Sequence, residues 1–261
     1  MLQGLAGKTA LVTGGSSGFG EATALRFAQE GVSVAVCGRD GAKTKSVAER
    51  AAAEARAAGH DAAEFPVMLG DVAKVADCKR LVAETATRLG HLDILVNSAG
   101  IWIEKPTTEM SEDEYDLLMD INLKGSYFMC REALRHMVAR KAGVIVNIAS
   151  DSGIHGEPGA AAYSASKAGV IMMTRAMAID HGPDGVRVCS VSPAIFDTPM
   201  LAKAIAEAPD PEAYGNVQDY GYPVGRIGRP EELAAVIAFL ASDEATFVTG
   251  RTWVVDGGVT A

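Results

Sequence analysis

The stretch TALVTGGSSGFG, from Thr9 to Gly20, runs an apolar segment of strand type directly into a glycine-rich loop. Glycines let the backbone turn sharply and come close to a pyrophosphate, and the helix that follows offers free N–H groups and a favourable dipole. No Gly-Lys-Ser/Thr follows, so the loop lacks the P-loop pattern. The stretch therefore predicts a strand, a loop and a helix that bind a dinucleotide.

Beyond this unit, apolar runs rich in Val and Ile alternate with longer segments of helical periodicity. Strands are expected at Thr9 to Thr13, Val32 to Cys37, Ala63 to Leu69, Ile94 to Asn97, Val144 to Ala149, Val186 to Val191 and Thr252 to Val255. Helices are expected at Glu21 to Glu30, Lys43 to Ala58, Ala73 to Leu89, Glu112 to Arg140, Ala161 to Asp180 and Glu231 to Leu240. This alternation predicts an α/β fold with a Rossmann-like, doubly wound parallel sheet of seven strands and helices on both faces, formed as a single domain over residues 1–261.

Composition excludes several classes of protein. Lys plus Arg number 24 and Asp plus Glu 33, which gives a net charge of -9 and argues against binding to nucleic acid or anionic membranes. No stretch approaches the roughly 20 apolar residues that span a bilayer, and Met1 to Lys8 has no signal-peptide core. The four cysteines are far apart and form no Cys-x-x-Cys, which favours reduced, buried thiols in a cytoplasmic protein.

The end of the second expected strand indicates which dinucleotide binds. NAD-binding folds usually place an acidic residue there to hold the ribose 2′-hydroxyl, but Gly38 occupies this place and Arg39 follows. A guanidinium at this point can pair with a 2′-phosphate. Asp40 stands one place later, where a shifted turn would restore the NAD role. We therefore expect NADP(H) to be preferred, with NAD(H) as the alternative.

Irregular sequence, rich in Pro and Gly, interrupts the pattern from Thr198 to Gly228, where only a short helix around Leu201 to Ala208 is expected. Long irregular insertions in compact domains are usually lids or binding loops. We expect this segment, at about residues 198–228, to be a substrate-binding lid. Its tyrosines, at positions 214, 220 and 222, would either cover a substrate or pack against a neighbouring subunit.

Tyr163 and Lys167 stand four residues apart, so on a helix both side chains project from one face. A cation near a phenol favours the phenolate and lowers a pKa that is normally about 10. A phenol whose pKa is lowered in this way can act as a general acid or base near neutral pH. Such a pair is common on solvated helix faces, and its meaning depends on the motifs around it.

Those motifs occur in order along essentially the whole chain. They are Thr13, Gly14, Gly18 and Gly20 in the loop, Asp71-Val72, Asn97-Ser98-Ala99-Gly100, Asn122, Ser150 thirteen residues before Tyr163, Ser192-Pro193-Ala194, Asp197-Thr198-Pro199 and Asp256-Gly257-Gly258. With them the chain resembles the short-chain dehydrogenase/reductase family, of the single-domain type with a Tyr-x-x-x-Lys active site. The departures are Ser98 for the more usual Asn and Ala194 for Gly, which adds a methyl group beside the nicotinamide.

The resemblance implies an oxidoreductase of class EC 1.1.1.-, transferring hydride between the nicotinamide and a carbonyl or secondary alcohol. Tyr163 would be the general acid and base, Lys167 would lower its pKa and hold the ribose hydroxyls, and Ser150 would bind the substrate oxygen. Asn122 would hold a water that links Lys167 to solvent. The alternatives are an NAD(H)-dependent alcohol dehydrogenase of the same family and a dinucleotide-sensing regulator without activity.

The resemblance also implies a set of contacts. The cofactor would be bound by Gly14, Ser16, Ser17, Gly18, Phe19, Gly20, Arg39, Asp71, Val72, Asn97, Ala99, Gly100, Tyr163, Lys167, Pro193, Ile195 and Thr198. A small-molecule substrate would meet Ser150 and Tyr163, with two further candidates: His155, which would equally suit a surface loop, and Trp102, which would equally suit structural packing. A homotetramer is implied, with the helices at Glu112 to Arg140 and Ala161 to Asp180 as one interface.

No metal site is expected. The acidic residues at positions 112, 113, 114 and 116 resemble metal ligands only superficially. Ser111-x-x-Glu114 instead has the pattern of a capping box, and acidic side chains are favoured at a helix amino terminus.

Overall fold

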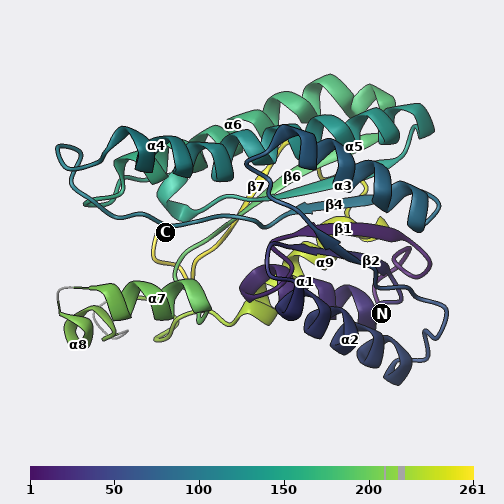
Figure 1. Cartoon of the computed structure of the whole chain (residues 1–261), viewed down its shortest axis with the longest axis horizontal. Coiled ribbons are helices and arrows are strands. Elements are labelled where there is room, and N and C mark those ends of the chain that lie inside the picture. Colours follow the sequence, from purple (N-terminus) through teal and green to yellow (C-terminus); the bar gives the residue numbers. More distant parts are fainter. Residues whose placement is uncertain (209, 217–220) are drawn as a thin grey trace.

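The computed structural model describes residues 1–208, 210–216 and 221–261. Its centre is a seven-stranded sheet in the order β3-β2-β1-β4-β5-β6-β7, with every neighbouring pair parallel (Figure 1). The strands are β1 (Thr9–Thr13), β2 (Ser33–Gly38), β3 (Val67–Leu69), β4 (Ile94–Asn97), β5 (Gly143–Ile148), β6 (Val186–Pro193) and β7 (Thr252–Val255). The predicted Rossmann-like sheet is confirmed.

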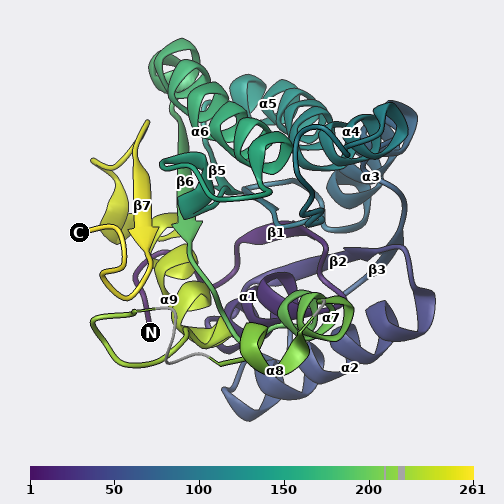
Figure 2. The same ribbon diagram turned by 90° about the vertical axis from the view of Figure 1, so that its left-hand side faces the viewer.

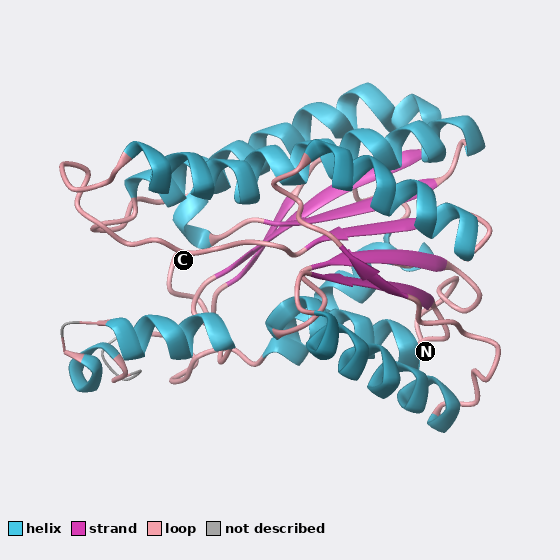
Figure 3. Cartoon of the chain, in the orientation of Figure 1, coloured by secondary structure: helices cyan, strands magenta, loops and turns pink. Residues whose placement is uncertain are grey.

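Helices cover both faces of this sheet. They are α1 (Gly18–Gln29), α2 (Gly41–Ala57), α3 (Val75–Arg88), α4 (Glu112–Met119), α5 (Ser126–Arg140), α6 (Ala161–His181), α7 (Pro199–Glu207), α8 (Pro211–Tyr214) and α9 (Pro230–Ala241). Helices α3 to α6 form one layer, and α1, α2 and α9 form the other (Figures 2 and 3). The short α7 and α8 stand beside the second layer rather than against the sheet (Figure 1).

Alternation along the strands divides the interior into two cores. Ala10 and Val12 of β1 pack with α1 and α9 residues such as Phe27 and Ile237, whereas Leu11 belongs to the core on the α3 and α5 side. Successive side chains of a strand point to opposite faces, so a strand that is apolar at every position fills both cores. All five residues of β1 are buried, as this arrangement requires.

Three elements differ from their sequence-based predictions. The third strand covers only Val67–Leu69, because Pro66 has no N–H to donate, although the carbonyls of Glu64 and Pro66 still accept from β2. The single helix expected over Glu112 to Arg140 contains a π-helical segment, η1 (Asp120–Gly125), between α4 and α5. In the described part of the segment predicted as a lid, α7 begins two residues earlier than expected, at Pro199, and α8 follows it.

The sheet order brings the functional segments to one place. The chain leaves β1 toward β2 on one side, and β4 pairs with β1 on the other side. In doubly wound sheets a crevice opens at this reversal, outside the carboxyl ends of the strands, and ligands bind there. The segments that follow β1, β2 and β4 all contribute residues to one cavity.

Two further expectations concern the environment of the chain. Cys37, Cys78, Cys130 and Cys189 are all free and buried, as predicted. Within the described ranges, none of the helices combines the length and apolar composition needed to cross a lipid bilayer.

Candidate active site

The glycine loop between β1 and α1 forms one wall of the cavity. Gly14 and Gly18 have φ values of 62° and 54°, in the region that favours glycine. A Cβ at Gly20 would lie 2.3 Å from the carbonyl oxygen of Gly14, so a side chain there would displace the turn. The N-cap residue Ser17 makes no side-chain capping bond, which leaves N–H groups of the first turn of α1 open to an anion. The loop therefore fits a pyrophosphate.

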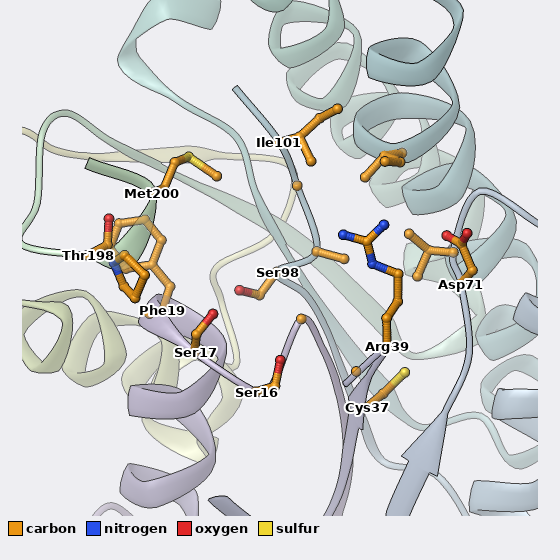
Figure 4. Close-up of a pocket in the computed structure, with 18 of the residues that line it drawn as sticks. Ser16, Ser17, Phe19, Cys37, Arg39, Asp71, Ser98, Ile101, Thr198 and Met200 are labelled. Atoms are coloured by element: carbon orange, nitrogen blue, oxygen red, sulfur yellow. The ribbon is translucent and has the colours of Figure 1, made fainter. Parts of the chain in front are cut away.

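The cavity gathers most of the residues predicted to bind a dinucleotide. Those that line it are Gly14, Ser16, Ser17, Gly18, Phe19, Arg39, Asp71, Val72, Ala99, Gly100 and Thr198. Lining residues that the sequence reasoning did not include are Cys37, Gly38, Gly70, Ser98, Ile101, Ile121, Pro199 and Met200. Figure 4 shows the Arg39 side chain extending from the end of β2 into the cavity, on the side of Asp71 and across from Ser17 and Thr198.

The predicted cofactor contacts at positions 20, 97, 163, 167, 193 and 195 do not line this cavity. Asn97 is 3% exposed, and its Nδ2 donates to Asn147 Oδ1 at 2.8 Å, which ties the end of β4 to β5. The N–H of Ile195 donates to the Tyr222 hydroxyl at 2.9 Å, so a lid residue holds the group expected to meet the cofactor. Both groups are therefore engaged within the protein, although Asn97 Oδ1 is buried without a hydrogen-bond partner among the described residues, and their contact with the cofactor stays a prediction.

Ser150, Tyr163 and Lys167 converge beside the cavity, and all three are buried. Tyr163 and Lys167 lie one turn apart on α6, with the Lys167 Nζ 5.6 Å from the centre of the phenol ring. The ammonium donates to the carbonyl oxygen of Ile148, the last residue of β5, at 3.0 Å. Ser150 follows β5 and caps a short 3-10 helix, η2 (Asp151–Gly153), by accepting from the Ser152 N–H.

Asn122 holds the loop after β4 in place through hydrogen bonds within the protein. It lies in the π-helical segment η1, and its Oδ1 accepts from Ile101 N at 2.9 Å while its Nδ2 donates to Ile101 O at 3.0 Å. A Cβ at Gly100 would lie 3.3 Å from this Oδ1 and 3.6 Å from Lys167 Nζ, so the two side chains meet at the same loop. The predicted water-holding role of Asn122 stays a prediction.

Comparisons with known proteins identify the family. The model of a family described as "Enoyl-(Acyl carrier protein) reductase" matches residues 14–260. The glucose 1-dehydrogenase of Gluconobacter oxydans is 40% identical over 257 residues, which are 98% of this chain and 92% of that protein. The chain belongs to the short-chain dehydrogenase/reductase family.

Two further relatives agree. A 3-oxoacyl-[acyl-carrier-protein] reductase of Thermotoga maritima is 37% identical over 255 residues, which are 98% of each chain. The crystal structure of levodione reductase superposes with a TM-score of 0.92 at 31% identity, covering 98% of this chain and 99% of that one. As a short-chain dehydrogenase/reductase, the chain is an oxidoreductase that acts on CH–OH or C=O groups.

In this short-chain dehydrogenase/reductase, burial controls both proton-exchanging groups of the site. It raises the pKa of Tyr163 above its ordinary value of 10.0; a hydrogen bond with Ser150 opposes this, and the charges of Asp151 and Glu157 add to it. Burial lowers the pKa of Lys167 from 10.5 to about 8. The pKa of Tyr163 is thus raised in the chain alone, with desolvation of the phenol as the largest cause, and the expected lowering by Lys167, whose Nζ lies 5.6 Å from the ring centre, stays a prediction.

The two further substrate candidates lie on different segments near Tyr163. Trp102 follows β4 and packs edge-on against the Tyr163 ring, with 4.3 Å between the ring centres. His155 lies in the loop after η2, where its Nε2 is 3.3 Å from Glu157 Oε1. Trp102 thus forms a wall beside the phenol, whereas the half-exposed His155 pairs with a carboxylate.

Carboxylates near Ser150 are the part of the site that the sequence reasoning missed. Asp151, His155 and Glu157 each have one possible ligand atom, all within 4.8 Å of one another. Acidic groups often gather in this way without a metal, and these make hydrogen bonds to Ser150 and Ser152, so we assign no ion to them. At the other acidic cluster the predicted capping box of Ser111 and Glu114 is confirmed.

Proposed function

We propose that the chain transfers hydride between NADP(H) and a carbonyl or secondary alcohol, with Tyr163 as general acid and base. One observation carries this proposal: the buried Ser150, Tyr163 and Lys167 lie beside a cavity that is lined by the glycine loop and the uncapped start of α1, with Lys167 Nζ 3.6 Å from the Cβ position of the lining residue Gly100. The bound nicotinamide supplies or accepts the hydride. The protein orients the reacting groups and moves the proton.

Each side chain has one task in the proposed reaction. In reduction the Tyr163 hydroxyl gives its proton to the substrate carbonyl oxygen, and in oxidation the phenolate takes the proton of the substrate hydroxyl. Ser150 binds the same oxygen, and Lys167 holds the ribose hydroxyls with its ammonium. Trp102, edge-on to Tyr163, supports the phenol and limits the water around it.

The test of this function is Tyr163→Phe, which removes the proton donor and keeps the ring that packs against Trp102. General acid–base catalysis contributes about 100- to 10,000-fold, so kcat should fall by about that factor while NADPH still binds. Tyr127→Phe is the matched control, because Tyr127 is 46% exposed on α5. Near-normal turnover of Tyr163→Phe would show that another group donates the proton.

Three observations support the preference for NADP(H). Arg39 lines the cavity and has no ion-pair partner among the residues that the structure describes. A Cβ at Gly38 would lie 2.5 Å from Thr44 Oγ1, so the position of the usual acidic residue has no room for one. Asp40, the alternative acid, accepts from Ala42 N and Lys43 N as the N-cap of α2, so its carboxylate is already engaged.

We propose that the segment at residues 198–228 binds the substrate and acts as a lid. We also propose that residues 1–261 form one domain. Tyr214 donates to Glu104 Oε2 at 2.9 Å, which links α8 to the loop after β4. Tyr222 holds Ile195 N, and Tyr220 lies outside the described residues. The relatives are named for glucose and for a 3-oxoacyl thioester, so a screen of sugars, ketones and thioesters with NADPH and NADH is the direct route to the substrate.

We further propose a homotetramer in a reducing, cytoplasmic environment. Large apolar side chains are exposed on the outer helical layer, including Leu117 of α4, Met172 and Ile179 of α6, and, near β7, Phe247. Apolar exposure of this kind marks interaction surfaces. Sedimentation should give a mass about four times 27.1 kDa, and a monomer would contradict the proposal.

A further inference from the structure

Asp151 is a buried carboxylate that the proposed mechanism does not use. It directly follows Ser150 and is 6% exposed. Its Oδ1 accepts from the Ser150 hydroxyl at 2.9 Å and from the Ser152 N–H at 2.9 Å. A carboxylate held this close to a catalytic hydroxyl determines where the proton of that hydroxyl points.

The Ser150 hydroxyl has one proton and two lone pairs. The Ser152 N–H donates to one lone pair at 3.2 Å. The proton can go to Asp151 Oδ1 at 2.9 Å or to Ser152 Oγ at 3.3 Å, and the carboxylate is both the nearer and the stronger acceptor. The second lone pair is left for another donor, and Tyr163, which is buried on α6 and whose pKa responds to Ser150, is near enough to supply one.

This arrangement favours the phenol over the phenolate. A phenol O–H can donate to the free lone pair of Ser150. A bond from the Ser150 hydroxyl to a phenolate would lower the pKa of Tyr163, and Asp151 competes for the proton that this bond needs. We propose that Asp151 is a positioning residue that holds the Ser150 proton and thereby keeps Tyr163 in its proton-donating form. The proposal rests on the proposed function of Tyr163, and it adds that the site is set for carbonyl reduction.

The groups around Asp151 act on its pKa in both directions. Burial raises the pKa of Asp151, Glu157 raises it further, and His155 opposes the shift; both of these neighbours come from the loop after η2. The hydrogen bonds from Ser150 and Ser152 also lower this pKa, by stabilising the carboxylate. From α6, which packs against η2, Tyr163 faces the carboxylate and Lys167 donates to Ile148 O. The only charged residue of β6, which also contacts η2, is Arg187, and it donates to backbone carbonyls at Leu240, Ser242 and Val248.

The test replaces Asp151 by Asn, which still accepts from the Ser152 N–H but is neutral. The weaker acceptor frees the Ser150 proton for the phenolate, so we expect the proton affinity of Tyr163 to fall about tenfold, a pKa change of about one. In alcohol oxidation the rate rises with pH as Tyr163 ionises. At saturating cofactor, the midpoint of this rise should move to lower pH by the same amount. Asp151→Ser is the second variant if Asp151→Asn does not fold, with the same expectation.

Glu157→Gln is the matched control. Glu157 acts on Tyr163 by charge and accepts from Ser152 Oγ at 2.8 Å, without a bond to Ser150. Its replacement should move the profile less than that of Asp151. Equal shifts in the two variants, or no shift in Asp151→Asn, would overturn the proposal, because the carboxylate would then act by charge alone or not at all.

A second readout needs no turnover. The ultraviolet absorbance of tyrosinate along an alkaline titration, taken as the difference from Tyr163→Phe, reports the ionised fraction of Tyr163 in the cofactor-free protein. It should rise in Asp151→Asn, and in a Ser150→Ala background the added effect of Asp151→Asn should shrink to that of Glu157→Gln. An undiminished effect without Ser150 would overturn the proposal. If no variant turns over any substrate, the proposed function fails, while the absorbance still tests Asp151.

Discussion

The two ends of the cleft differ in what holds them in place. At the cofactor end the wall is backbone: the glycine loop passes so close to itself and to the loop after β4 that a Cβ at Gly14 would lie 2.8 Å from Ala99. At the substrate end the walls are side chains from separate segments, such as Trp102 against Tyr163 and Tyr214 on Glu104. A backbone wall accepts one shape of ligand, whereas walls of side chains can change by substitution without altering the fold.

The largest effect is expected when alanine replaces Gly20, and it is compared with the same change at Gly156. Gly20→Ala would place a Cβ 2.3 Å from the Gly14 carbonyl oxygen, and backbone cannot move aside cheaply. Overpacking costs about 1–3 kcal/mol, so NADPH affinity should fall up to about 100-fold, measured by calorimetric titration. Gly156→Ala in the loop after η2 is the control, because no atom lies within 4 Å of its Cβ position, and binding there should stay within about twofold. Equal losses of NADPH affinity in the two variants would show that the close backbone contacts do not set the shape of the cofactor end.

Arg39→Ala tests whether the preference for NADPH over NADH at the cofactor end depends on a single side chain. Hydrogen bonds to charged groups are worth about 1.5–3 kcal/mol, so the NADPH/NADH ratio of kcat/KM should fall about 10- to 100-fold. Arg56→Ala, an exposed position near the far end of α2, should leave the ratio unchanged. An unchanged ratio in Arg39→Ala would remove the basis for the NADP(H) preference.

Lys167 shows that the cofactor end carries a cost in stability. Its folded pKa is about 8 against 10.5 in the ordinary state, so between these values the unfolded chain binds more protons, and stability rises with pH. Below pH 8 the buried ammonium destabilises the fold. Lys167→Met should therefore unfold at higher urea concentration at pH 7, by about 2 kcal/mol, with the gain disappearing near pH 10, while turnover is lost.

The control for that measurement is Lys79→Met, at an exposed position of α3, which should change stability by less than about 0.5 kcal/mol at either pH. A loss of stability in Lys167→Met at pH 7 would mean that the bond from Lys167 to the Ile148 carbonyl outweighs the desolvation of the ammonium. In that case Lys167 would stabilise the fold, rather than destabilise it for the sake of function.

Most of the fold could be predicted because its signals are local. Each of the central strands β1, β2, β4, β5 and β6 is a short apolar run that fills two cores, as Leu11 and Val12 do on opposite faces of β1, and the glycine loop follows the first of them. Parallel strands joined by helices leave few other topologies. Arg39 could be placed in the cavity from the sequence because it stands at the end of β2, where position along the chain fixes position in the site.

The rest depends on contacts between distant segments. Asn97 ends β4 and matches a cofactor motif, and nothing in the sequence indicates that its Nδ2 donates to Asn147, fifty residues away in the chain. The π-helical segment around Asn122 forms where that side chain binds both backbone groups of Ile101. Asp151 next to Ser150 was visible in the sequence, but its burial was not, and burial is what gives an acidic residue control over a neighbouring hydroxyl.

The smallest expected effect lies at the proposed lid. The bond from Tyr214 to Glu104 Oε2 is exposed, and such bonds contribute about 1 kcal/mol or less, so Tyr214→Phe should raise the substrate KM about two- to fivefold and leave cofactor affinity and kcat almost unchanged. Glu104→Gln should do the same, and the double variant should add little, because both changes remove one contact. Tyr127→Phe is again the control. Additive effects, or an equal change in NADPH affinity, would mean that Tyr214 does not act through Glu104 at the substrate end, since this bond joins α8 to the loop after β4 and does not touch the glycine loop at the cofactor end.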